Sequence, residues 1–211
     1  MKNSLCVAAL VVLSFVSCAY AGETRNIPYE APPPPPPSVF EKGRFTYSSL
    51  WQGYGSFSFD HHGPTINYIM SSSRLGYMLS SPRGEGRWRG NYELLAEGVY
   101  GSIVSGPGDW VGGFNILVRR NFISRDEKWN WYLHAGGGLI WNDIYKNLDQ
   151  TLVGRSREFS IVAGGGIRYQ FNAKWSINAE LDYRHMSNAD TAPRNTGLNS
   201  FGGGIGLGYT F

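Results

Sequence analysis

Cysteine is nearly missing from this chain of 211 residues, because its only two, Cys6 and Cys18, both lie among the first 21. If that segment is removed on export, no disulfide, Cys-based metal site or Cys nucleophile remains. No later segment has 18 apolar residues in a row, which excludes a transmembrane helix. The net charge is only +3, and no basic stripe with interleaved aromatic residues occurs, so we expect no nucleic-acid partner.

The first 21 residues have the pattern of a secretory signal peptide. Lys2 supplies the positive start, an apolar run extends from Leu5 to Val16, and Ala19-Tyr20-Ala21 has the small-x-small form of a cleavage site. A lipoprotein cleavage site at Cys18 is the alternative interpretation.

Residues 22–42 are predicted to form a proline-rich periplasmic tail. The six consecutive prolines at 32–37 favour an extended polyproline II conformation without hydrogen bonds of its own. A spacer is the simpler interpretation of such a run, and a recognition motif is the alternative.

What the chain has in abundance is glycine and aromatic residues: Gly 28, Tyr 13, Phe 11 and Trp 7. Behind an export signal, this composition predicts an all-β domain over residues 43–211, an eight-stranded antiparallel outer-membrane β-barrel with aromatic residues at the membrane interfaces. The expected strands are 44–59, 65–79, 88–103, 108–122, 128–141, 157–171, 174–187 and 198–211.

The lengths of the connections support this topology. An even number of strands places both termini on the periplasmic side, where the predicted connections are short. The two long connections, 142–156 and 188–197, then fall outside the cell. The alternate glycines at the end of the chain suit a narrow barrel whose interior is filled by side chains from other strands.

The stretch 175–187 shows the strictest alternation. Its odd-numbered residues from Trp175 to Tyr183 are apolar and its even-numbered residues are polar, which predicts a strand with lipid on one side and a polar interior on the other. His185 and Ser187 continue the odd series and therefore face the lipid. A histidine base and a serine nucleophile two residues apart suggest an enzyme that attacks a membrane lipid.

These residues also carry a resemblance to a known family. His185-Met186-Ser187-Asn188-Ala189, with 195–200 on the last strand, resembles the PagL family of lipid A 3-O-deacylases, and the close resemblance covers residues 175–211. It implies an outer-membrane barrel with an outward-facing Ser-His-Glu triad. The implied substrate is lipid A, the acylated anchor of lipopolysaccharide, and the implied location is the outer membrane of a Gram-negative cell.

The resemblance implies roles for particular residues. His185 would be the general base, Ser187 the nucleophile, and Asn188 a contributor to the oxyanion site through its amide or backbone N–H. The family's glutamate position holds Asn199, which can fix the imidazole tautomer but cannot neutralise an imidazolium. Asp190 is the nearest substitute acid in sequence.

Other polar residues have simpler interpretations. His134 has inward parity and is expected to lie in the barrel interior, and His61-His62 is expected in an external turn. Loop cations are candidate contacts for lipid A phosphates: Arg155, Arg157 and Arg194. A paired interior charge set is expected, formed by Glu93, Glu97, Arg168, Glu180, Asp182 and Arg184.

We therefore predict a cofactor-free and metal-independent carboxylic ester hydrolase, with lipopolysaccharide and the outer membrane as partners and a homodimer left open. A non-catalytic barrel that serves a structural, adhesive or lipopolysaccharide-binding role is the main alternative, and Asn199 in place of glutamate favours it. A small pore is a third hypothesis, which the crowded polar interior disfavours.

Overall fold

Eight β-strands make up most of the described chain, which covers residues 37–57 and 64–211 of this computed structural model. The strands are β1 (Phe45–Phe57), β2 (Asn67–Met78), β3 (Gly90–Ser105), β4 (Trp110–Ile123), β5 (Trp129–Asn142), β6 (Arg157–Gln170), β7 (Trp175–Ser187) and β8 (Leu198–Thr210). Two short 3-10 helices, η1 (Gly86–Trp88) and η2 (Ile144–Lys146), lie in the connections. All eight predicted strands are present.

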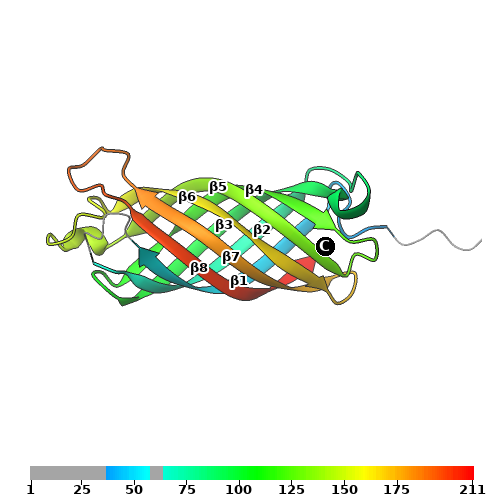
Figure 1. Cartoon of the computed structure of the whole chain (residues 1–211), viewed down its shortest axis with the longest axis horizontal. Helices are drawn as coiled ribbons and strands as arrows, with labels where there is room; N and C mark the ends of the chain where they lie inside the picture. Colours follow the sequence, from blue (N-terminus) through cyan, green and yellow to red (C-terminus); the bar gives the residue numbers. More distant parts are fainter. Residues whose placement is uncertain (1–36, 58–63) are drawn as a thin grey trace, which may run out of the picture. The chain divides into compact units, whose positions relative to one another are not determined.

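The strands form a closed antiparallel barrel, in which each strand pairs with the next and β8 pairs with β1 (Figure 1). Closure satisfies every strand edge, as a sheet surrounded by lipid requires. No helix within the described ranges is long and apolar enough to cross a membrane. The predicted signal peptide, nearly all of the proline run and His61-His62 lie outside the described residues.

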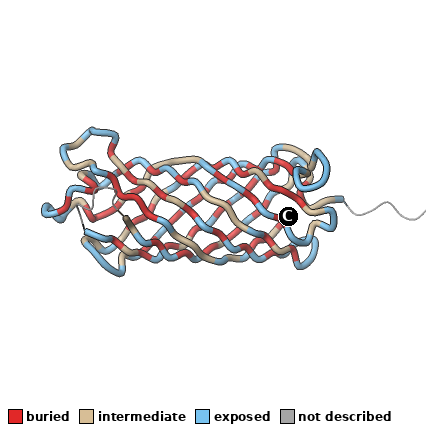
Figure 2. The backbone as a smooth tube through the Cα atoms, viewed as in Figure 1, coloured by how far each residue is buried: buried red, intermediate tan, exposed pale blue. Residues whose placement is uncertain are grey.

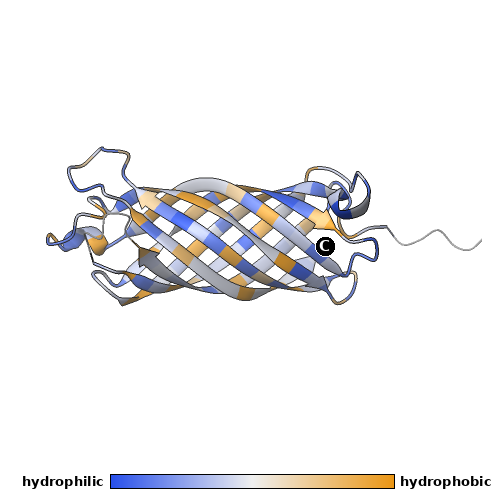
Figure 3. Ribbon diagram, viewed as in Figure 1, coloured by the Kyte–Doolittle hydropathy of each residue, from blue (hydrophilic) through white to orange (hydrophobic). Residues whose placement is uncertain are grey.

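Burial alternates along much of the barrel wall and most regularly in β7, as the two-residue pattern of the sequence predicts (Figure 2). Large apolar side chains, such as Trp51, Leu181 and Ile205, are exposed on the outside of the barrel. Hydrophobic and hydrophilic residues are interspersed along the strands (Figure 3). Four successive inward positions of β8, at residues 202, 204, 206 and 208, are glycines because neighbouring strands fill the space. A Cβ at Gly202, for example, would come within 2.3 Å of the Tyr54 ring.

The centre of the barrel is filled by a lattice of ion pairs. Arg74 is fully buried and lies 2.8 Å from Glu97 and 2.7 Å from Glu180, and Arg184 lies 3.4 Å from Glu97. His134 is also inside, with Nε2 3.0 Å from Asp182 Oδ1. Buried charges are stable only when they are paired, so this lattice confirms the predicted interior charge set, which comprises Glu93, Glu97, Arg168, Glu180, Asp182 and Arg184.

Apolar clusters lie at the two ends of the lattice. At the end with the long connections, here called the loop end, Ile144, Leu152 and Val153 of the β5–β6 connection pack against Met186 and Leu198. The C-terminus lies at the other end of the barrel (Figure 1). There Phe40 packs on Met78 and Ile123. Phe40 belongs to the last residues of the predicted tail, and it packs there together with Val39, while Lys42 is exposed.

Candidate active site on the outer wall

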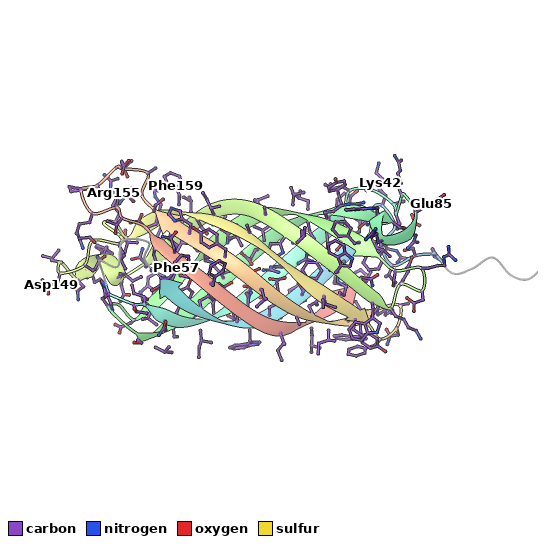
Figure 4. All side chains as sticks on the ribbon, in the orientation of Figure 1. Lys42, Phe57, Glu85, Asp149, Arg155 and Phe159 are labelled. Atoms are coloured by element: carbon purple, nitrogen blue, oxygen red, sulfur yellow. The ribbon has the colours of Figure 1, made fainter. Side chains whose placement is uncertain are left out.

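His185 and Asn199 are direct partners in the β7–β8 register. The inward side chains beside them, Met186 and Leu198, are buried in the loop-end apolar cluster. Because side chains alternate along a strand, this burial holds His185 and Asn199 on the outer, lipid-facing wall. Figure 4 labels Phe57, the β1 partner of Asn199, close to the loop end of the barrel.

One side-chain oxygen binds both neighbours of the candidate base. Asn199 Oδ1 lies 2.8 Å from His185 Nδ1 and accepts a hydrogen bond of 2.7 Å from the Tyr183 hydroxyl. An amide oxygen can only accept, so Nδ1 carries the proton and donates it. The other ring nitrogen, Nε2, is then unprotonated and can act as a base in the neutral imidazole.

Gly197 fixes the other side of the imidazole. It has a φ of +79°, which favours glycine, and a Cβ at this position would come within 2.7 Å of His185 Cε1. Its backbone N–H donates to Leu152 O at 2.9 Å, which ties the β7–β8 connection to the β5–β6 connection. The imidazole is thus held between a backbone turn and the Asn199 amide.

Ser187 ends β7 on the same outer face, two residues from His185, and is half-buried. Two residues along a strand span roughly 7 Å, and the imidazole bridges part of that distance. Phe159 of β6, labelled in Figure 4, is the register partner of Ser187. The nucleophile and base of the prediction therefore share one face, with Asn199 beside the base.

The connection after Ser187 is organised by Asn188, which is buried. Its backbone N–H donates to Asn195 Oδ1 at 2.8 Å, and its Nδ2 donates to Arg194 O at 2.9 Å. These bonds give Asn188 a structural role in the loop, and its contribution to an oxyanion site stays a prediction. Asp190 Oδ1 accepts from Asn195 Nδ2 at 2.7 Å, so its carboxylate belongs to the loop and is not placed as a substitute acid at the imidazole.

A pocket of about 570 Å³ lies beside Ser187 at the loop end and is called the loop pocket here. Phe159 and Asn188 form its side next to the serine, and Trp141, Arg155 and Arg157 are also among its lining residues. Of the three predicted phosphate contacts, Arg157 is exposed, and Arg155 donates to Thr191 O.

The third predicted phosphate contact, Arg194, has a different role. Its guanidinium donates to Tyr145 O at 2.8 Å and to Asn147 O at 2.7 Å. A guanidinium committed to backbone carbonyls holds the two long connections together, so the structure does not support the prediction that Arg194 contacts phosphate.

Sequence reasoning did not identify Tyr183 or Gly197. Tyr183 has the same parity as His185, so the alternation places it on the correct face. Its contact with Asn199 depends on the register between β7 and β8, which the sequence pattern leaves open. Gly197 could only have been recognised from the turn before the last strand.

The closed barrel and its outer-wall site define a membrane-embedded protein of the outer-membrane β-barrel class. The model of the family described as "Lipid A 3-O-deacylase (PagL)" matches residues 53–208, and the chain belongs to this family. This membership confirms the resemblance inferred from the residues around His185.

Solved structures agree with the fold. The crystal structure of the outer membrane enzyme PagL is similar with a TM-score of 0.54 and 16% sequence identity, over 74% of this chain and 97% of that chain. Neisserial surface protein A (NspA) is similar with a TM-score of 0.55 and 12% identity, over 79% of this chain and 97% of that chain. At these identities the similarity shows the fold alone. No curated protein sequence matches the chain.

Proposed function

We propose that this chain is a serine esterase of the Gram-negative outer membrane that hydrolyses the 3-position acyl ester of lipid A. The observation that carries this proposal is the hydrogen-bonded His185–Asn199 pair on the lipid-facing wall, with Ser187 on the same face. Family membership gives the substrate class. A site on the outer wall meets an acyl ester directly from the leaflet.

In the proposed reaction, His185 Nε2 takes the proton of Ser187 Oγ as this oxygen attacks the ester carbonyl carbon. The bond from that carbon to the sugar oxygen breaks, and His185 returns the proton to this oxygen, which leaves as the sugar hydroxyl and leaves the acyl group on Ser187 Oγ. Water then attacks the acyl-enzyme with His185 again as base, which releases a fatty acid and restores Ser187.

Asn199 acts in this scheme as a positioning residue. It orients the imidazole and fixes its tautomer through Nδ1, as asparagine does in Cys-His-Asn proteases. Unlike a carboxylate, it supplies no negative charge for the imidazolium that forms during attack. We therefore expect slower turnover than a glutamate would give at this position.

The loop pocket suits the polar part of the substrate. Arg157 is exposed there and offers a charge-assisted contact to a phosphate, and Arg155 lies beside it. Because Phe159 borders both the loop pocket and Ser187, a headgroup in this pocket would place its acyl ester near the nucleophile.

The test is to express the chain in Gram-negative cells with intact lipid A and to measure the lipid A by mass spectrometry. We expect the loss of one 3-position acyl chain with the wild-type chain and no loss with Ser187→Ala or His185→Ala. An unchanged acyl count alongside folded wild-type protein would contradict the proposal.

A non-catalytic barrel is the second candidate, favoured by Asn199 at the position where the family's known form has glutamate. It predicts that cells carrying wild type and Ser187→Ala have the same lipid A and the same surface properties. The mass of lipid A from cells with the wild-type chain and from cells with Ser187→Ala therefore distinguishes the two candidates.

A further inference from the structure

The lipid-facing wall of the barrel carries almost no charge. Among the outward positions of the eight strands, all of which the structure describes, the Lys, Arg, Asp and Glu residues are Arg120 and Arg157 alone. Arg157 lies at the loop end, where it lines the loop pocket. Arg120 lies on β4 near the opposite end of the barrel. A charged side chain on a wall that faces lipid is costly, so Arg120 requires a partner.

The described protein supplies no counter-charge for Arg120. Its half-buried guanidinium donates one hydrogen bond, to Trp88 O at 2.9 Å, and forms no ion pair within residues 37–57 and 64–211. The Glu127 carboxylate at the same end of the barrel pairs instead with Arg89, at 3.0 Å. A guanidinium has five N–H donors, so most of those on Arg120 are open to a partner from outside the chain.

Aromatic rings hold this guanidinium in place. Its Cζ lies 5.0 Å from the centroid of the Tyr92 ring and 5.2 Å from that of the Phe122 ring. Phe122 stacks on Trp131 at 3.6 Å between centroids, and the exposed Trp88 ring lies 6.1 Å from Phe122. Cation–π contacts orient a guanidinium but leave its charge unneutralised. Because Tyr and Trp gather at the level of the lipid headgroups, these rings place Arg120 at that level.

Apolar side chains continue from Arg120 toward the membrane interior. Leu133 on β5 is its register partner. Val118 lies two residues away along β4, or about 7 Å, and pairs with Leu94 on β3. All three apolar side chains are exposed on the wall. A cation at headgroup level next to an exposed apolar surface matches the two parts of a phospholipid, its phosphate and its acyl chains.

We propose that Arg120 binds the phosphate of an anionic glycerophospholipid of the periplasmic leaflet, with an acyl chain of this lipid lying over the three apolar residues. A guanidinium binds a phosphate group through paired N–H···O bonds. The leaflet follows from the predicted topology, which makes this end periplasmic. Figure 4 labels Glu85, from the connection that carries Trp88, at the end opposite Arg155. The site lies on β3–β5, so it does not depend on the proposed deacylase function.

The first experiment measures lipid binding to the refolded full-length chain in detergent by native mass spectrometry, with phosphatidylglycerol as the probe. Arg120→Met removes the guanidinium and keeps the wall apolar. We expect the dissociation constant of the first bound lipid to rise about 10-fold, for the loss of one charge-assisted contact.

Arg125→Met is the matched control, because Arg125 is an exposed arginine of the β4–β5 connection and its loss changes the net charge equally. We expect this variant to bind like wild type. Equal dissociation constants in wild type and Arg120→Met, or an equal rise in both variants, would overturn the inference.

Two further arms identify the ligand. Phosphatidylcholine has the phosphate but no net charge, and we expect it to bind more weakly than phosphatidylglycerol. Inorganic phosphate has no acyl chain, and we expect it not to displace phosphatidylglycerol at the same concentration. Displacement by inorganic phosphate would mean a site for a free anion and would overturn the assignment to a lipid.

A second measurement locates the lipid in a bilayer. The wild-type chain is reconstituted in phosphatidylcholine vesicles with a small fraction of phosphatidylglycerol that carries a photoactivatable diazirine midway along one acyl chain. We expect crosslinks to concentrate on Leu94, Val118 and Leu133, and to fall in Arg120→Met to the level of the remaining wall. Crosslinks spread evenly around the wild-type barrel would contradict the inference, even if Arg120→Met failed to fold.

Discussion

His185 and Asn199 lie 14 positions apart in the sequence and face each other across β7 and β8, with Nδ1 and Oδ1 2.8 Å apart. The contact depends on strand register, since a shift of one residue would turn one of the two side chains into the barrel. Met186 and Leu198 fix that register from the inside by packing in the loop-end apolar cluster. Apolar packing inside the barrel therefore positions the His185–Asn199 pair on its outer wall.

Substitution of Asn199 tests its positioning role. Asn199→Leu removes the acceptor for Nδ1–H, and we expect kcat/KM to fall by about 100-fold because the imidazole loses its tautomer and orientation. Asn199→Glu adds the missing charge and should raise kcat by about 10-fold. Initial rates on purified lipid A measure both effects. Equal rates in all three proteins would show that Asn199 does not act through His185.

Gly197→Ala tests the backbone contact with the imidazole. The added Cβ meets His185 Cε1, and displacement of the ring by a few tenths of an ångström or more should lower kcat by about 10- to 100-fold. Gly43→Ala is the control, because Gly43 has a similar positive φ of 89° but open space around its Cβ. Loss of activity in both variants would point to general strain rather than to the imidazole.

Arg74→Met tests the interior lattice. The substitution leaves the carboxylates of Glu97 and Glu180 without their closest cation. Removal of one partner from a buried ion pair costs about 3–5 kcal/mol, and we expect a loss of this size in the free energy of unfolding. Urea titration of the refolded protein in lipid vesicles measures it. An unchanged midpoint would mean that the lattice adapts without cost.

The Asp143 carboxyl makes the stability of the loop end depend on pH. Burial raises the pKa of this carboxyl, but the backbone N–H groups of Asp109 and Trp110 donate to Oδ1, at 2.9 and 3.1 Å, and the net effect is a lowered pKa. Its stabilising contribution is therefore complete above the unfolded value of about 3.9 and is lost as the pH falls through the lowered folded value.

Asp143→Asn should remove this dependence. We expect the wild-type loop to resist proteolysis better than the variant at neutral pH, and the two to become alike when the carboxyl is protonated. Cleavage of the 143–156 connection is followed at both pH values. A constant difference between wild type and variant would assign the effect to another group.

The positions of the strands, and the face of the barrel wall on which His185 and Ser187 lie, could be predicted because one physical rule determines both. A barrel wall between lipid and a polar interior imposes a two-residue period, and β7 shows this period without interruption from Trp175 to Ser187. The same rule placed Asn199 on the outer wall and His134 in the interior.

The finer features of the site could not be predicted, because they depend on register and loop geometry. The contacts of Tyr183 and Gly197 are made across strands and turns that carry no periodic signal. Arg194 looked like a free loop cation in the sequence, but its guanidinium binds backbone carbonyls of the other long connection. The hydrogen bonds of Asn188 within its own loop could not be predicted either, because they also depend on loop geometry.

The most direct measurement is the release of fatty acid from purified lipid A by the refolded chain, with wild type and Ser187→Ala compared in the same detergent. We predict that the wild type releases one fatty acid per lipid A and that Ser187→Ala releases none. Equal release by both proteins, or no release by a folded wild type, would contradict the assignment of Ser187 as the nucleophile of a lipid A deacylase.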